Sequence, residues 1–129
     1  MREGGAPAVV EGALRRWFTE AFAARHPDVI AYWRSKTLSN DRDSYVSAYE
    51  LYADCDRQLL HRLSEIGAST LILTGDRDLG QTPDMAREMA RRIPKSKIRI
   101  FPEVAHMLPI EAAHDLNNVL REFVFTEDQ

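Results

Sequence analysis

Two carboxylates follow a short apolar run in the stretch LILTGDRDLGQTP, residues 71–83, and a histidine follows a second such run. The run TLIL has no polar face, which is typical of a strand buried on both sides in a parallel sheet. In open α/β sheets the reactive groups gather at the carboxyl ends of the strands. We therefore expect Asp76 or Asp78 to lie beside His106, where a carboxylate can fix the imidazole tautomer and stabilise the imidazolium. Such a pair is the acid–base half of a nucleophilic triad.

Each of these residues also has an ordinary structural interpretation. An aspartate after a strand commonly bonds the backbone of its own turn, and a single histidine in a loop is more often structural or solvated. We expect structural roles for the other three histidines, which are His26, His61 and His114. No group of His, Cys, Asp or Glu has metal-ligand spacing, and no glycine loop fits a nucleotide, so we predict neither a metal nor another cofactor.

The elements that must position the pair follow from apolar periodicity, and the first half of the chain predicts helices. An apolar stripe over residues 9–22 predicts a first helix, and Pro27 suits the first turn of a second one. A third helix should carry the tyrosines of residues 45–52. Asp56 can cap a fourth helix that Gly67 ends.

From Thr70 onward the pattern changes to strand, helix, strand, helix. TLIL predicts a strand, Thr82 and Pro83 begin a helix whose inner stripe includes Met85 and Met89, and KIRIF predicts a second strand nearer a sheet edge. The last helix places these apolar residues on one side: Ile110, Leu116, Val119, Leu120 and Phe123. The fold class is therefore α/β, with a parallel unit and right-handed crossovers.

Composition excludes several classes of function. The formal net charge of -3 gives no basic footprint for nucleic acid. No apolar run approaches the roughly 20 residues needed to cross a bilayer, and the start of the sequence has no apolar leader. A single cysteine, Cys55, fits a reducing compartment. We expect a cytoplasmic protein with no nucleic-acid or membrane partner.

Residues 69–124 resemble the C-terminal end of α/β-hydrolases. Those proteins commonly show a Thr-Leu strand, Gly-x-x-Asp, Thr-Pro, a second strand, Gly-His and an acidic amphipathic helix. This sequence follows the same order, with Ala105 in place of the glycine before the histidine. The resemblance implies that Asp78, rather than Asp76, is the triad acid and that His106 is the triad histidine. Glu111 matches an acidic residue that often begins the last helix.

The first half resembles the helical cap of 3-oxoadipate enol-lactonases, above all in the block RWFT within ALRRWFTEAFAARHPDVIAYWRSKTL. This implies a hydrolase of a small anionic enol-lactone in aromatic catabolism, the β-ketoadipate pathway. It also implies a helical cap-like segment over residues 1–54 and the C-terminal part of the hydrolase core over residues 55–129. Arg15, Arg16 and Trp17 are candidates for facing the substrate carboxylate; the alternative is a solvated basic face beside a core tryptophan.

The sequence lacks the Gly-x-Ser-x-Gly of the nucleophile elbow and the His-Gly loop that supplies part of the oxyanion hole. Because the family order is nucleophile, acid, histidine, we expect the nucleophile to precede residue 1 and this chain to be inactive alone, as a truncated C-terminal portion. Another α/β-hydrolase remains an alternative: an esterase, a C–C hydrolase, an epoxide hydrolase or a dehalogenase. A third possibility is a non-catalytic fragment or split-protein module that pairs with a separate N-terminal half.

Overall fold

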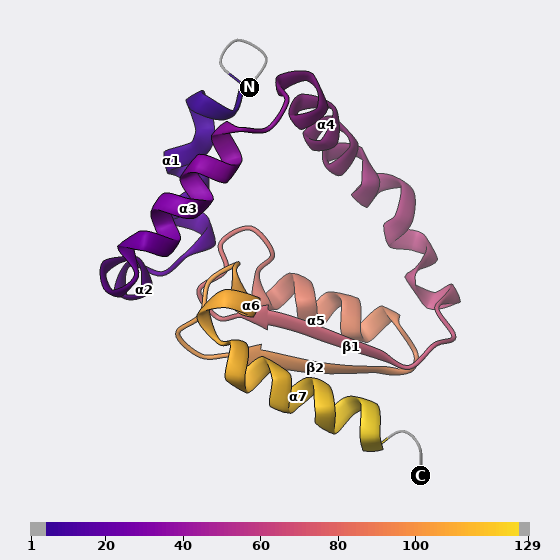
Figure 1. Ribbon diagram of the computed structural model, residues 1–129. Coiled ribbons are helices and arrows are strands. Elements are labelled where there is room, and N and C mark those ends of the chain that lie inside the picture. The colour runs from indigo at the N-terminus through magenta and orange to yellow at the C-terminus, as the bar shows by residue number, and fades with distance from the viewer. Residues whose placement is uncertain (1–4, 127–129) are drawn as a thin grey trace.

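The computed structural model describes the backbone of residues 5–126 and the side chains of residues 9–125 except 42, 53, 54 and 56–58. Two regions follow one another along these residues, a helical region and a region built around a parallel pair of strands (Figure 1). The helical region holds α1 (Gly5–Trp17), α2 (Glu20–Arg25), α3 (Pro27–Leu38), α4 (Arg42–Leu59) and the 3₁₀ helix η1 (Leu60–Glu65). The strand region holds β1 (Thr70–Gly75), α5 (Pro83–Arg92), β2 (Ser96–Phe101), α6 (Leu108–Glu111) and α7 (Ala113–Thr126).

The helical region is organised around one apolar cluster of buried residues, Val10, Leu14, Phe18 and Phe22. The stripe that contains them was expected to form one helix over residues 9–22, and that expectation is wrong. Thr19 has extended backbone, with φ −68° and ψ 151°, and its hydroxyl accepts a hydrogen bond from the Phe22 N–H. Thr19 therefore caps a new helix, because its side chain satisfies one of the N–H groups that a helix start leaves without a partner.

The helix α4 corrects a second expectation. It runs without a break from Arg42 to Leu59 and then tightens into the 3₁₀ helix η1. Asp56 thus lies inside a helix instead of capping one, and its side chain lies outside the described residues. The division that we predicted between residues 54 and 55 falls inside α4, so no linker separates the two segments, and that division stays a prediction.

The strands β1 and β2 pair in parallel over their whole length, from Thr70 opposite Ser96 to Gly75 opposite Phe101. The helices α5 and α7 cover opposite faces of this pair, as Figure 1 shows. The α5 side buries Ile72, Ala86 and Ile93, and the α7 side buries Phe101, Val104 and Leu108. The predicted parallel α/β unit is confirmed, but among the described residues β1 has a strand on one side only.

The helix α5 begins as predicted, with Thr82 as its cap and a proline in its first turn. Met85 and Met89, however, are 46% and 38% exposed, so their assignment to the core is wrong. The sheet beneath α5 is only two strands wide, and the helix buries Ala86 and Ile93 against it instead. Met85 and Met89 each lie one residue before an alanine, Ala86 or Ala90, on the side of α5 that packs against the sheet.

The last predicted helix is divided at Ala112, whose φ of −133° and ψ of 41° end α6 before α7 begins. Leu116 and Val119 pack against the sheet as expected. Ile110 instead packs on the cluster of the helical region, and Leu120 is 39% exposed. The short helix α6 therefore joins the strand region to the helices that precede it.

Candidate active site

Asp78 and His106 meet beyond the carboxyl ends of the two strands. The Nδ1–H of His106 donates a hydrogen bond of 2.8 Å to Oδ2 of Asp78. The other carboxylate oxygen, Oδ1, accepts from the N–H groups of Gly80 at 2.8 Å and Gln81 at 2.9 Å. The Asp78 side chain is 5% exposed and that of His106 is 40% exposed. A buried, fully bonded carboxylate thus holds an imidazole that solvent can reach.

The turn that follows β1 explains why only one of its two carboxylates takes part. Asp78 closes its own turn through Gly80 and Gln81, as the structural interpretation of a strand-end aspartate predicted. The buried hydroxyl of Thr74 donates to the Gln81 carbonyl at 2.7 Å and fixes the same turn. Asp76 instead lies 3.7 Å from the guanidinium of Arg77 on the exposed side. Asp78 therefore both closes its own turn and contacts His106.

The loop that carries the histidine lies directly against the end of β1. A Cβ added at Gly75 would stand 2.0 Å from the Val104 carbonyl oxygen, closer than any real contact. The Asp76 N–H donates to the Phe101 carbonyl, and the Arg77 N–H donates to the Val104 carbonyl, each at 2.9 Å. The two strand-end loops are therefore joined backbone to backbone, and only glycine allows this approach.

Glu111 fixes the same loop from the other side. Its Oε2 accepts from the Ala105 N–H at 2.6 Å, and its Oε1 accepts from the N–H and the hydroxyl of Thr19 at 2.7 and 2.8 Å. The Met107 N–H in turn donates to the Trp17 carbonyl at 2.8 Å. Sequence reasoning placed Glu111 at a family position but missed these bonds, whose only signal was an acidic residue shortly after the histidine.

The chemistry available to the pair follows from its hydrogen bonds. An ionised carboxylate can only accept, so its bond to Nδ1 assigns the ring proton to that nitrogen. This leaves Nε2 of His106 as the basic nitrogen on the accessible side of the ring. A group placed there can lose a proton to Nε2, and Asp78 can stabilise the imidazolium that results.

Trp17 is the one predicted cap residue that lies beside this loop. Its carbonyl bonds Met107, the residue after His106, and its half-buried ring packs edge-on against Trp33 with centroids 6.5 Å apart. The indole therefore forms part of the apolar cluster of the helical region, as the structural alternative for it predicted.

Arg15 and Arg16 are exposed at the end of α1. Among the described residues, no hydrogen bond or ion pair joins either guanidinium to Asp78 or His106. The charge of Arg16 acts on Tyr45 within the helical region: burial and the hydrogen bond that Tyr45 donates to Tyr49 raise the pKa of Tyr45 to about 12, and Arg16 opposes that rise. Among the described residues the structure joins Asp78 to His106, and the contact of Arg15 and Arg16 with a substrate stays a prediction.

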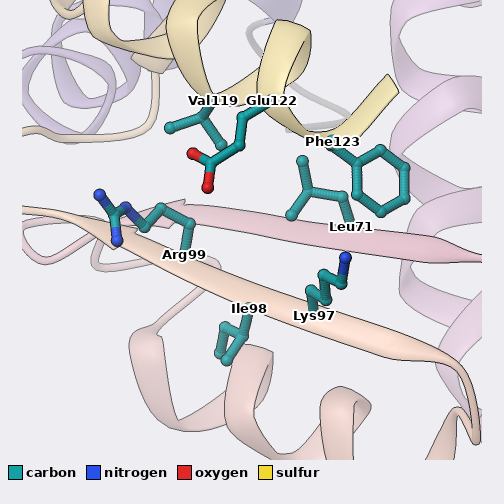
Figure 2. Close-up of a pocket in the computed structure, with 7 residues that line it drawn as sticks. All are labelled: Leu71, Lys97, Ile98, Arg99, Val119, Glu122 and Phe123. Atoms are coloured by element: carbon teal, nitrogen blue, oxygen red, sulfur yellow. The ribbon is translucent and has the colours of Figure 1, made fainter. Parts of the chain in front are cut away.

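A second feature, a shallow open hollow between β2 and α7, contains none of these residues. It is lined by Leu71, Lys97, Ile98, Arg99, Val119, Glu122 and Phe123. Figure 2 shows Lys97 and Arg99 directed toward α7 and Ile98 directed to the opposite face. Leu71 and Lys97 are the second residues of their strands, whereas Asp78 and His106 follow the strands' last residues. The hollow therefore lies along the strands, whereas the pair lies beyond their carboxyl ends.

Two further findings concern the described residues only. Within them, no three His, Cys, Asp or Glu side chains are grouped so as to hold a metal ion. Across residues 5–126, none of the helices has the length and apolar character that crossing a membrane requires.

Comparison with known proteins gives the class to which this arrangement corresponds. The chain is 22% identical over 120 residues to 3-oxoadipate enol-lactonase 2 of Acinetobacter baylyi. The aligned residues make up 93% of this chain and 44% of that protein. The crystal structure of the enol-lactonase from Burkholderia xenovorans superposes with a TM-score of 0.90 at 28% identity, over 96% of this chain and 46% of that one. No protein-family model matches the chain.

A further solved structure, described as an N-acyl homoserine lactone degrading enzyme, superposes with a TM-score of 0.73 at 25% identity. The match covers 92% of this chain and 50% of that one. The chain therefore has a partial α/β-hydrolase fold, namely its helical cap and its last two strand–helix units. Among α/β-hydrolases it resembles the enol-lactonases, and it spans about half the length of the relatives it matches.

Proposed function

We propose that Asp78 and His106 are the acid and the histidine of a hydrolase triad that opens a small anionic lactone or ester. The observation that carries this proposal is the 2.8 Å hydrogen bond from His106 to a buried aspartate whose other oxygen accepts two backbone N–H groups. The names of the similar proteins, two enol-lactonases and a lactone-degrading enzyme, support a lactone as the substrate class. The first candidate is 3-oxoadipate enol-lactone.

The proposed reaction uses His106 twice. In the first step Nε2 takes the proton of the nucleophile, which attacks the lactone carbonyl, and the imidazolium then gives that proton to the departing enolate oxygen. The ring C–O bond breaks and an acyl group remains on the nucleophile. In the second step Nε2 takes a proton from water, whose oxygen attacks the acyl carbonyl. The bond between the acyl group and the nucleophile breaks, the imidazolium returns the proton to the nucleophile, and the acid is released. Asp78 stabilises the imidazolium in both steps.

The nucleophile and the oxyanion donors are proposed to come from outside residues 1–129. The sequence holds no Gly-x-Ser-x-Gly, and the relatives extend well beyond the matched half. The outer edge of β1, which pairs with no strand among the described residues, is the edge that we propose the missing N-terminal half would extend. Whether that half belongs to the same polypeptide or to a partner is an outcome of the experiment below.

The cap residues enter the proposal in a secondary role. Arg15 and Arg16 carry positive charge on an exposed surface, which supports a contact with the carboxylate of an anionic substrate. Trp17 lies beside the histidine loop and would form an apolar wall. The single cysteine, Cys55, fits the reducing cytoplasm in which we propose that the protein acts.

The test begins with the coding DNA upstream of residue 1, which we expect to encode a Gly-x-Ser-x-Gly in one frame. The encoded N-terminal half is then produced joined to this chain and, separately, alongside it. We expect hydrolysis of 3-oxoadipate enol-lactone by the assembled protein and none above background by the 129-residue chain alone. His106→Ala and Asp78→Asn should each lower the rate by about 10⁴-fold.

The matched controls are Asp76→Asn and His61→Ala, which change the same residue types away from the pair and should keep the rate. Loss of activity in the controls as well would contradict the assignment of roles. Turnover by the isolated chain that His106→Ala abolishes would contradict an outside nucleophile. Hydrolysis of an N-acyl homoserine lactone or a simple ester instead would keep the triad and change the substrate. An aspartate at the elbow would indicate epoxide-hydrolase or dehalogenase chemistry.

A further inference from the structure

The backbone on both sides of His106 is fixed by residues outside its own loop. Before it, the Ala105 N–H donates to Oε2 of Glu111 at 2.6 Å. After it, the Met107 N–H donates to the Trp17 carbonyl at 2.8 Å. The imidazole itself is bonded only through Asp78 among the described residues. The direction of the ring therefore depends on how these two flanking bonds set the loop.

Glu111 connects the first of these bonds to the helical region. Its Oε1 accepts both the N–H and the hydroxyl of Thr19, a residue 92 positions away in the sequence. The Thr19 hydroxyl also accepts from the Phe22 N–H and so caps α2. One carboxylate thus receives three hydrogen bonds, one from the histidine loop and two from the corner between α1 and α2.

We propose that Glu111 is a positioning residue, which holds His106 against Asp78 and couples that orientation to the docking of the α1–α2 corner, residues 17–19. The kinetic part of this proposal rests on the proposed hydrolase function, whereas the orientation of the ring does not. With the corner docked, both flanks of His106 are held and Nδ1 faces Asp78. Without the Glu111 bonds, the loop keeps its Val104 and Met107 backbone bonds but loses the bond at Ala105, directly before His106, and the ring loses its fixed direction.

A carboxylate is suited to this task because both of its oxygens accept hydrogen bonds. Glu111→Gln keeps the size of the side chain but replaces one oxygen by an NH₂ group. That group then faces the N–H of Ala105 or of Thr19, with which it cannot form a hydrogen bond. Thr19→Ala removes the hydroxyl bond and keeps the N–H bond, so its effect should be smaller. Thr19→Ser keeps both bonds and is the matched control.

The experiment reads the ring of His106 in the full 129-residue chain by ¹⁵N NMR at a pH where the imidazole is neutral. In the unaltered chain we expect a single tautomer with its proton on Nδ1. Asp78→Asn gives the reference for a ring that has lost its partner. Glu111→Gln should move the ¹⁵N shifts toward that reference, Thr19→Ala should move them part of the way, and Thr19→Ser should leave them in place.

A Glu111→Gln chain that is less stable but keeps the Nδ1–H tautomer would overturn the proposal, because Glu111 would then be only structural. If that variant does not fold, as judged by circular dichroism, Thr19→Ala decides in the same way. In the assembled hydrolase, Glu111→Gln should lower kcat by about 10²-fold with KM unchanged, the effect of a slightly misplaced catalytic group. A ring that is not Nδ1–H in the unaltered chain would contradict the proposed triad itself, so the two failures are distinguishable.

Discussion

Backbone hydrogen bonds join the two strands of one region, whereas side chains join the helices of the other. In the strand region, backbone hydrogen bonds join β1 to β2 and continue into the loops beyond them, through Asp76 with Phe101 and Arg77 with Val104. In the helical region, α1 and α3 meet through side chains: Trp17 lies edge-on to Trp33 with ring centroids 6.5 Å apart, and Arg34 donates to the Glu11 carboxylate at 2.6 Å. Hydrogen bonds require defined directions, whereas apolar contacts tolerate small shifts.

This difference explains where the reactive pair lies. Asp78 and His106 both follow strands whose ends are fixed by directional bonds, so their separation is set closely. The helical region reaches the loop of His106 by hydrogen bonds from the α1–α2 corner, at Trp17 and Thr19, and by apolar packing of Met107 and Ile110 on its cluster. We infer that the strand region sets the geometry of the pair and that the cap adjusts it through these contacts.

The variant with the largest expected effect tests whether the two regions unfold independently of each other. Phe18 is 3% exposed, and Phe18→Ala should cost about 4 kcal/mol of unfolding free energy by leaving a cavity in the helical cluster. Amide hydrogen exchange should then accelerate at Val10 and Leu14 and change little at Ile72. Ile93→Ala is the matched control in the strand region and should give the opposite pattern. Equal acceleration throughout would mean that the two regions unfold as one unit.

The next effect tests the backbone contact that brings the two strand-end loops together. Gly75→Ala places a methyl group within 2.0 Å of the Val104 carbonyl oxygen, so the histidine loop must move. We expect a loss of about 3 kcal/mol in urea unfolding, together with loss of the His106–Asp78 bond. Gly67→Ala meets nothing within 4 Å and should change stability by no more than about 0.5 kcal/mol. Similar losses in the two variants would refute the close-approach explanation.

A third, smaller effect compares one helix cap from each region. Thr19 and Thr82 both accept a hydrogen bond from the third residue of their helix, Phe22 and Met85. Thr82→Ala should cost about 1 kcal/mol, the usual value of a lost cap. Thr19→Ala should cost about 2 kcal/mol, because it also removes a hydrogen bond to the Glu111 carboxylate. Thermal unfolding measures both, and equal losses would show that the corner adds nothing to the cap.

The smallest effect concerns a tyrosine pair in α4. Partial burial, and then a hydrogen bond with Tyr49, raise the pKa of Tyr45 to about 12. The unfolded chain ionises this phenol near pH 10, so it binds fewer protons than the folded chain between about pH 10 and 12. Stability should therefore fall as the pH rises through that interval, and one of the four tyrosines should ionise late in an absorbance titration.

Tyr49→Phe is the control for that titration, since it removes the hydrogen bond and keeps the ring. The late ionisation should then move toward pH 10, although burial keeps it above that value. A titration in which all tyrosines ionise together in the unaltered chain would contradict the packing of Tyr45 in the helical region.

Sequence reasoning succeeded where a few neighbouring residues decide the outcome. Thr82 with Pro83 marked the start of α5, and TLIL and KIRIF marked the strands, because caps and apolar runs act within one or two turns of chain. It failed where the width of the packing surface decides. Met85 and Met89 have core spacing, but a two-stranded sheet is too narrow to bury them. Thr19 interrupted a continuous apolar stripe because its capping bond outweighed the periodicity.

By itself, the sequence determined that a carboxylate and a histidine follow two parallel strands, and that no Gly-x-Ser-x-Gly lies within the 129 residues. It left the two aspartates distinguishable only by family resemblance. The tertiary structure decided that Asp78 reaches His106 while Asp76 turns to Arg77, because the bonds of the turn after β1 direct the two side chains apart. It alone joined Thr19 to Glu111 across 92 residues, since such contacts arise from packing and not from local periodicity.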